Sequence, residues 1–371
     1  GSLPRPQAVV DFLFARERGE AFDQAAFDAC MAEAVMENVR RQKEAGIDIV
    51  SDGEMSKISY ATYIKDRYTG FDGDSDRRTP ADLLDYPGFM KRLASAGGTP
   101  TYRRPCCVGP IQVKSLLPLE HDIAHVKAAA HKYGAQGIFM NAASPGLITA
   151  FQVNRFYPSH EAYLADLADA MREEYETIVA EGFYLQLDCP DLAMSRHTGY
   201  QDATEEEFLK IAAANVEALN AATANIPPER MRMHVCWGNY EGPHDHDIAL
   251  EKVIDIVIKA RPATVLFEAA NPRHEHEWKV WGEKKPPAGK ILATGVISHS
   301  TNVVEHPELV AERILRFTRL VGRERVIAAA EARLQAHPTP GAALHALRRE
   351  LLQDDVQLTD DVTLIALRRV P

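Results

Sequence analysis

A histidine and a cysteine lie two positions apart in RMRMHVCWG, a segment whose other residues predict a buried β-strand. Side chains two apart on a strand share a face, so His234 and Cys236 are expected to point into one site. Imidazole nitrogen and thiolate sulfur together form a ligand pair that zinc prefers. Such a pair is also compatible with packing or hydrogen bonding inside a strand.

A carboxylate at the end of another apolar run favours the metal interpretation. Glu268 closes the segment TVLFE, where a charged group is costly unless it has a partner. With His234 and Cys236 it would supply three ligands and leave one tetrahedral position open, as in catalytic zinc sites. An open position beside a cysteine ligand suits a thiol substrate, which zinc holds as a thiolate for alkyl transfer. Hydrolysis by zinc-bound water is the competing reaction.

Polar side chains also follow other predicted strands. Asp52 and Glu54 share one face of SDGE, and Asp188 ends the segment LQLD. Carboxylates facing a pocket can hold the ammonium group of an amino acid, although acids at such positions also bind backbone amides. His299, in GVISHS, could exchange a proton near the reacting centre. Further histidines in charged loops are interpreted as solvent-facing residues or helix starts rather than ligands: His244, His246, His274 and His276.

Alternating strands and helices must position these residues. Strands are predicted to end at Leu3, Val50, Met140, Leu187, Val235, Phe267, Ile297 and Ile327. Helix N-caps are predicted at Asp23, Ser159 and Thr204, and helix ends at Gly46, Gly182 and Gly322. This order predicts an α/β fold with an all-parallel sheet closed into a (βα)8 TIM barrel. An open doubly wound sheet is the alternative, but no GxGxxG follows an early strand.

The predicted barrel spans residues 1–328, and residues 329–371 form a separate, atypical C-terminal segment. Residues 72–118 interrupt the rhythm with polar, glycine- and proline-rich sequence. They are interpreted as an insertion between the second and third strands that either covers the barrel mouth or decorates the surface. Within it, RRPCCVGPIQV is predicted to form a small hairpin.

The composition is that of a globular protein. Of the 371 residues 46% are hydrophobic and 26% are charged, and the formal net charge of -11 is spread along the chain. Neither a nucleic-acid footprint nor an apolar run of the roughly 18 residues of a membrane helix is present in the sequence. The five cysteines lack framework spacing, which predicts reduced thiols and a cytoplasmic protein. A homo-oligomer remains open.

In their order along the chain, these motifs resemble the cobalamin-independent methionine synthase family, specifically short single-barrel members similar to the catalytic C-terminal half of the long enzyme. The resemblance runs through VSDGEMSKISYATYI, MNAASPGLITAF, YLQLDCPDLA, HVCWGNYEGP, VLFEAAN and GVISHSTNVVEHPELVAERI. It implies a (βα)8 barrel and an S-methyltransferase of methionine biosynthesis, 5-methyltetrahydropteroyltriglutamate–homocysteine S-methyltransferase. It also implies a zinc ion that activates the homocysteine thiol and a methyltetrahydrofolate as methyl donor.

The resemblance assigns roles to individual residues. The matches to zinc ligands are His234, Cys236 and Glu268. The positions that hold the amino acid match Ser2, Glu54 and Asp188, and the catalytic histidine near the thiol matches His299.

The chain departs from the family pattern near its end. The family carries a fourth zinc ligand, a cysteine, after its last strand, but here no cysteine follows Cys236. Glu331 could replace that ligand, three ligands could suffice, or zinc could be weakly bound or absent. Two alternatives therefore stay open. One is another zinc-assisted thiol alkyltransferase, of the epoxyalkane:coenzyme M transferase type, and the other is a non-catalytic barrel that has lost its metal.

Overall fold

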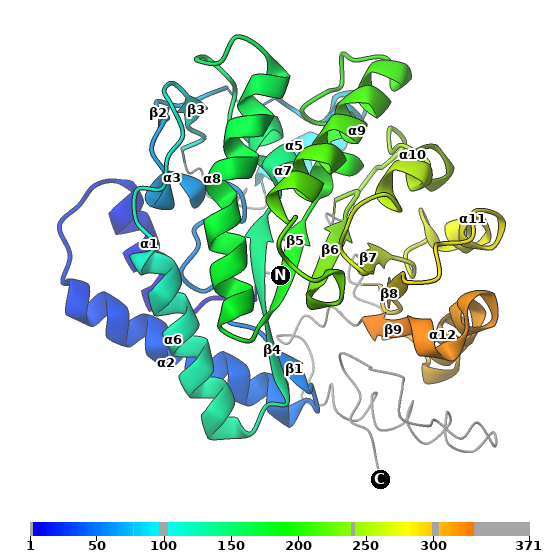
Figure 1. The fold of residues 1–371 in the computed structure, drawn as a ribbon, viewed down its shortest axis with the longest axis horizontal. Coiled ribbons are helices and arrows are strands. Elements are labelled where there is room, and N and C mark those ends of the chain that lie inside the picture. Colours follow the sequence, from blue (N-terminus) through cyan, green and yellow to red (C-terminus); the bar gives the residue numbers. More distant parts are fainter. Residues whose placement is uncertain (1–2, 77, 96–102, 239–241, 299–303, 330–371) are drawn as a thin grey trace.

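A curled parallel sheet forms the centre of the molecule (Figure 1). The computed structural model describes residues 3–76, 78–95, 103–238, 242–298 and 304–329. Within them, seven strands pair in the order β1-β4-β5-β6-β7-β8-β9, all parallel. Their bounds are β1 Ile49–Val50, β4 Gly137–Ala143, β5 Tyr184–Asp188, β6 Met231–Val235, β7 Thr264–Glu268, β8 Ile291–Gly295 and β9 Val326–Ala329. The α/β barrel class is confirmed.

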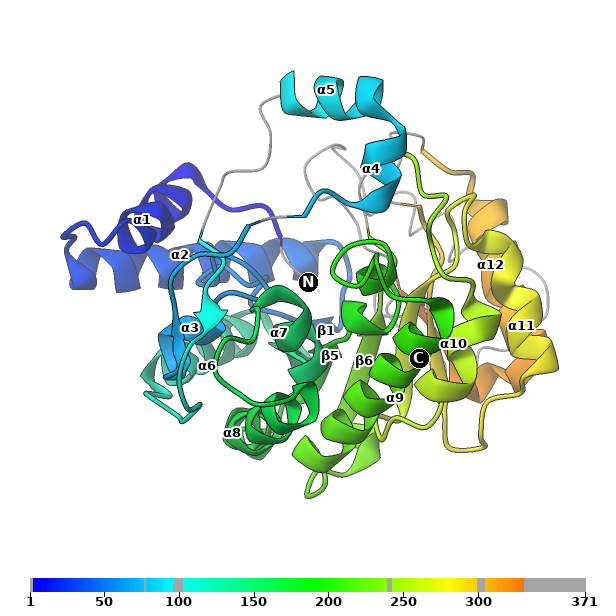
Figure 2. The ribbon, with the colours of Figure 1, turned by 90° about the horizontal axis from the view of Figure 1, so that it is seen from above.

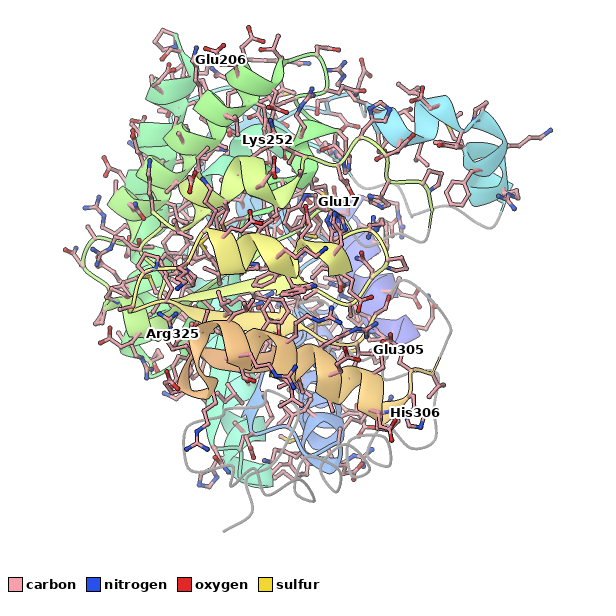
Figure 3. The ribbon with its side chains drawn as sticks, turned by 90° about the vertical axis from the view of Figure 1, so that its right-hand side faces the viewer. Glu17, Glu206, Lys252, Glu305, His306 and Arg325 are labelled. Carbon is pink, nitrogen blue, oxygen red and sulfur yellow. The ribbon has the colours of Figure 1, made fainter. Side chains whose placement is uncertain are left out.

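Helices cover the outer side of the sheet, and α10, α11 and α12 lie next to one another there (Figure 3). The α-helices outside the insertion are α1 Gln7–Glu17, α2 Gln24–Glu44, α3 Ile64–Arg67, α6 Leu117–Tyr133, α7 Pro145–Phe151, α8 His160–Ala180, α9 Glu205–Ala222, α10 Leu250–Val257, α11 Trp278–Glu283 and α12 Pro307–Val321. Short 3-10 helices are η1 Pro190–Leu192, η2 Met194–Arg196, η3 Pro228–Arg230, η4 Glu275–Glu277 and η5 Arg323–Arg325. In the described part of the chain, no helix has the length and hydropathy needed to cross a bilayer.

The predicted helix caps are confirmed by their hydrogen bonds. The Asp23 carboxylate accepts from the backbone N–H groups of Ala25 and Ala26 at the start of α2. Thr204 and Glu207 form a reciprocal capping box at the start of α9. Such caps satisfy N–H groups that have no partner within the helix, and each stabilises the fold by about 0.5–2 kcal/mol.

The predicted first strand, which would end at Leu3, stays a prediction because residues 1 and 2 lie outside the described residues. Leu3 itself is not in a strand. Instead, the N–H of Leu3 donates to the carbonyl of Gly53 at 3.0 Å, directly after β1. Strands β1 and β9 are consequently the two edges of the described sheet.

The insertion lies between β1 and β4, as predicted, and contains β2 Phe71–Asp72, α4 Ala81–Asp85, α5 Pro87–Ser95 and β3 Cys106–Cys107. The predicted hairpin within residues 103–113 is wrong, since β3 pairs antiparallel with β2 instead. Pro105 and Pro110 remove donors on both sides of β3, which disfavours pairing within that segment.

Helix α4 of the insertion packs on loops at the carboxyl end of the sheet. The N–H of Ala81 donates to the carbonyl of His197 at 2.8 Å, in the loop after β5. Figure 2 shows α4 and α5 projecting beyond the remaining helices, and Figure 3 shows them at the end of the molecule where Glu305 precedes α12. The insertion therefore contacts the face at which the predicted site residues lie.

A buried ion-pair network fixes the segment after β1 to two helices. The Arg67 guanidinium lies 2.6 Å from the Glu174 carboxylate of α8 and 2.8 Å from the Asp122 carboxylate of α6. The hydroxyls of Tyr63 and Tyr68 also donate to Glu174, each at 3.1 Å. All these side chains are buried, so each charge depends on its partners rather than on water.

Replacing Glu174 with alanine should strongly destabilise the fold. The substitution leaves the buried Arg67 cation without one of its two carboxylates, and the expected loss in the free energy of unfolding is about 3–5 kcal/mol. Urea denaturation followed by circular dichroism measures it. As a control, Lys127→Gln breaks the exposed Lys127–Glu181 pair and should cost less than about 1 kcal/mol. Equal losses in the two variants would contradict this account.

Candidate active site

The strand register brings predicted site residues from separate strands together. Asp188 of β5 is level with His234 of β6, and Val235 is level with Phe267 of β7. Continued by one residue, this register places Cys236 level with Glu268. All of these residues lie at the carboxyl end of the sheet, where parallel barrels hold their sites.

One hydrogen-bonded chain connects the residues predicted to hold an amino acid with a predicted metal ligand. The side-chain amide of Asn141 donates to Glu54 Oε1 at 2.8 Å and to Asp188 Oδ2 at 3.4 Å. The other oxygen of Asp188 lies 3.3 Å from His234 Nδ1. Glu54, Asn141 and Asp188 are only 2%, 3% and 8% exposed, so their charges and dipoles are poorly screened by water.

Asn141 is a site residue that the sequence analysis did not identify. Asn141 is the one amide in the otherwise apolar strand β4, GIFMNAA. A single polar residue in an apolar strand is the feature of the sequence that could have identified it. Its Oδ1 atom is buried and accepts no hydrogen bond from the described residues. Lys57 approaches from the other side, where its ammonium group donates to the Asn141 carbonyl at 2.5 Å. The site therefore contains a buried acceptor with unused capacity beside two carboxylates.

The loop after β1 holds the Glu54 carboxylate in place. Glu54 has φ = 56°, a left-handed conformation that is uncommon for a residue other than glycine. Gly53 has φ = 66°, and a Cβ there would lie 2.2 Å from the Asn38 amide nitrogen. Arg5 braces the loop by donating to the carbonyls of Glu54 and Lys57 at 2.9 and 2.6 Å. The backbone is thus held in a demanding conformation by contacts from two other segments.

Burial and neighbouring charges change the protonation of two groups in the site. Burial raises the pKa of the Asp52 carboxyl, although the Lys57 ammonium opposes this effect. Burial lowers the pKa of the His234 imidazole, but hydrogen bonds with Asp188 and Cys236 outweigh it and raise this pKa well above its ordinary value. A carboxylate beside the imidazole thus favours a proton on the nitrogen that faces Asp188.

The three predicted metal ligands are half-buried and individually oriented. The side chain of His234 is 24% exposed. Cys236 Sγ accepts from the Gly238 N–H at 3.2 Å, and Glu268 Oε1 accepts from the Ala270 N–H at 2.6 Å. Among the described residues, the groups whose ligand atoms all lie within 4.8 Å of one another do not include these three side chains. Their assignment as metal ligands stays a prediction.

Other predicted site residues lie outside the described residues, namely Ser2, His299 and Glu331. Their roles also stay predictions. The interpretation of the loop histidines as solvent-facing holds for His246, whose side chain is 42% exposed, and for the exposed His276.

His244 and His274 do not face solvent, since their side chains are 0% and 5% exposed. The interpretation is therefore wrong for His244, whereas His274 is the N-cap of η4 and stands at a helix start, the other position predicted for these histidines. Both imidazoles contact the Asp247 carboxylate, at 3.2 and 3.1 Å, and this shared acid compensates their burial.

An additional acid between Glu54 and Asp188 should make stability depend on pH. In Asn141→Asp the new carboxyl is ionised in the unfolded chain above about pH 4. In the folded protein, the carboxylates of Glu54 and Asp188 oppose ionisation of the new carboxyl, so its pKa is higher in the folded than in the unfolded chain. The free energy of unfolding therefore falls as the pH rises from the unfolded-state pKa to the folded-state pKa. Urea unfolding at pH 5 and pH 8 should show a larger deficit relative to wild type at pH 8.

The uncharged variant Asn141→Leu is the control for this titration. It removes the amide but adds no titrating group, so its deficit should be similar at both pH values. A deficit of Asn141→Asp that does not change with pH would contradict the proximity of the two acids.

Sequence comparison finds similarity to methionine synthases, while no family model matches the chain. The chain is 23% identical over 332 residues to methionine synthase of Saccharolobus solfataricus, which covers 88% of this chain and 84% of that protein. It is 25% identical over 331 residues to methionine synthase of Thermococcus kodakarensis, covering 88% and 82%. The similarity therefore extends over most of both chains.

Solved structures show the same fold. A B12-independent methionine synthase from Shewanella sp. W3-18-1, solved with selenomethionine, has a TM-score of 0.64 at 19% identity, covering 90% of this chain and 92% of that one. A Listeria monocytogenes protein assigned to the same class has a TM-score of 0.65 at 17% identity, covering 95% of each chain. Motif order, relatives and fold agree: the chain is similar in sequence to methionine synthases and shares its fold with B12-independent methionine synthases.

Proposed function

We propose that this protein transfers a methyl group from a methyltetrahydrofolate to the sulfur of homocysteine, with a zinc ion held by His234, Cys236 and Glu268. The observation that carries this proposal is the hydrogen-bonded chain from Glu54 through Asn141 and Asp188 to His234. It joins a group of buried acceptors to a histidine–cysteine pair. The relatives named methionine synthase support the same reaction.

The acceptors of the chain suit the ammonium group of an amino acid. An ammonium group has three donors and no acceptor. Glu54 and Asp188 supply carboxylate oxygens, and Asn141 supplies the buried Oδ1 atom that lacks a hydrogen bond among the described residues. A bound cation would stabilise the two acids and satisfy this oxygen at once.

The residues near His234 fit zinc in their chemistry. Nitrogen, sulfur and carboxylate oxygen are the ligand atoms of zinc sites. The contact of Asp188 with His234 Nδ1 orients the ring and leaves Nε2 for a metal, which is a common arrangement around zinc-binding histidines. Zinc held here would keep the substrate thiol ionised at neutral pH.

The protein residues would then align the two substrates. The sulfur–carbon bond forms as the bond between the methyl carbon and the donor nitrogen breaks, and that nitrogen takes up a proton. Glu54, Asn141 and Asp188 would orient the amino acid so that its sulfur faces the methyl carbon. His299 would supply the proton or orient the donor.

Removing a predicted metal ligand should remove both metal and activity. Cys236→Ser and His234→Ala are each expected to lower the zinc content by one ion per chain and to abolish methionine formation, because three ligands leave little affinity in reserve. Elemental analysis of chelator-free protein and mass spectrometry of the product measure the two effects. Cys30→Ser, a half-buried cysteine on α2, is the matched control and should retain both. Variants at His234 and Cys236 with unchanged zinc and turnover would refute the assignment.

The identity of the thiol can be tested at the ammonium pocket. Glu54→Gln should raise the KM for homocysteine roughly ten- to hundred-fold, since a hydrogen bond to a charged group contributes about 1.5–3 kcal/mol. Coenzyme M carries a sulfonate in place of the amino-acid group and should show no such loss. Preferred turnover of coenzyme M, with homocysteine binding insensitive to Glu54→Gln, would favour the epoxyalkane:coenzyme M transferase alternative. Homocysteine binding without turnover would favour a non-catalytic barrel.

A further inference from the structure

A second group of ligating side chains lies beside the loop that follows Cys236. Its members are Asp82 of α4, His197 after η2, and His244 and Asp247 between β6 and α10. One ligand atom from each lies within 4.8 Å of the other three. Their side chains are 0%, 1%, 0% and 8% exposed, respectively. The group is therefore shielded from water.

The Nδ1 atom of His197 points to a missing partner. It lies 2.9 Å from Asp247 Oδ1 and 3.6 Å from Asp82 Oδ2. Despite these contacts, this buried nitrogen makes no hydrogen bond of acceptable geometry within the described residues. Ligands about 2.0–2.2 Å from a tetrahedral zinc ion are about 3.3–3.6 Å apart, so the spacing from His197 to Asp82 matches atoms that share one cation, and the shorter spacing to Asp247 would widen when a metal binds.

The charge of the group also calls for a cation. Two buried carboxylates repel each other unless positive charge lies between or beside them. Asp82 Oδ1 accepts from the backbone N–H groups of Asp245 and His246, each at 2.8 Å, which leaves Oδ2 on the side of His197. Asp247 is shared with His274, whose Nε2 lies 3.1 Å away, and with the Arg273 guanidinium, which lies 3.8 Å away and supplies part of the compensating charge. Without a metal, Asp247 would be stabilised by hydrogen bonds with histidines. The experiment must therefore distinguish a metal-bound cluster from a metal-free, hydrogen-bonded one.

We propose that Asp82, His197, His244 and Asp247 form a closed structural site for a divalent transition metal ion, of which zinc is the best match. Two nitrogens and two oxygens complete a tetrahedral set, and two carboxylates balance the charge of the ion. The absence of an exposed position distinguishes this site from the half-buried His234–Cys236–Glu268 site. It adds a second metal to the one in the proposed function and is independent of it.

The ion would connect three segments that are far apart in sequence. Asp82 belongs to the insertion, His197 to the loop after β5, and Asp247 to the loop after β6. The last loop begins at Cys236, so β6 holds the end that carries the predicted thiolate ligand and the metal would hold the other end. Its role is to dock the insertion on the carboxyl face of the sheet.

The test uses full-length protein in which the first site is removed by His234→Ala and Cys236→Ser. This background, purified without chelator and dialysed against zinc, should retain one ion per chain by elemental analysis. Adding His197→Gln or Asp247→Asn should remove that ion and eliminate the fall in melting temperature that EDTA causes. His246→Gln is the matched control, because His246 lies in the same loop but is exposed and pairs with Asp85. It should retain the ion.

Cobalt binding tests the proposal without any substitution in the cluster, so its result does not depend on whether the cluster variants fold. In the His234→Ala/Cys236→Ser background, cobalt(II) should produce visible d–d bands without the thiolate-to-cobalt charge-transfer band that a cysteine ligand would add. A background protein that binds neither zinc nor cobalt overturns the proposal and leaves the cluster as a hydrogen-bonded hub around Asp247. Metal retained after His197→Gln and Asp247→Asn, or lost with His246→Gln, also overturns it.

Discussion

The contact between Asp188 and His234 joins the two halves of the candidate active site. One oxygen of Asp188 faces the imidazole, and the other accepts from Asn141, which also holds Glu54. Because Asp188 and His234 are level in adjacent strands, this contact is set by the register of the sheet. The spacing between the acceptor pocket and the predicted metal ligand therefore depends on backbone hydrogen bonds, which are more rigid than loops.

Buried acids near the carboxyl face are compensated in three different ways. Glu174 pairs with Arg67, a cation supplied by the chain itself. Asp188 contacts the Asn141 amide and the His234 imidazole, which offset only part of the cost of burying its charge. This partial compensation suits a site that binds a charged ligand. Asp247 is surrounded by histidines, which can bind either a proton or a metal. The same electrostatic cost thus produces a fixed structural network, a binding pocket and a candidate metal site.

Local patterns in the sequence were sufficient to predict much of the fold. The caps at Asp23 and Thr204 depend only on neighbouring residues, and most strands are apolar runs between helices. The register explains why residues at the ends of neighbouring strands, such as Asp188 and His234, lie side by side. Contacts between distant segments could not be predicted in this way. Asn141 acts through residues of two other strand ends, and Cys106–Cys107 pairs with Phe71–Asp72 at the start of the insertion.

The open edges of the sheet also bear on how the chain folds. In the described residues, the edges are β1, near the start of the chain, and β9, near its end. Strands that are neighbours in the sheet also follow one another along the chain, apart from the insertion between β1 and β4. Each such pair can form soon after the helix that connects its two strands. Bringing the two edges together instead requires closure of a loop that includes nearly the whole barrel. Because such non-local contacts slow folding, we expect the edges β1 and β9, which do not pair with each other in the described sheet, to approach each other last, after the central strands β4 to β8 have assembled.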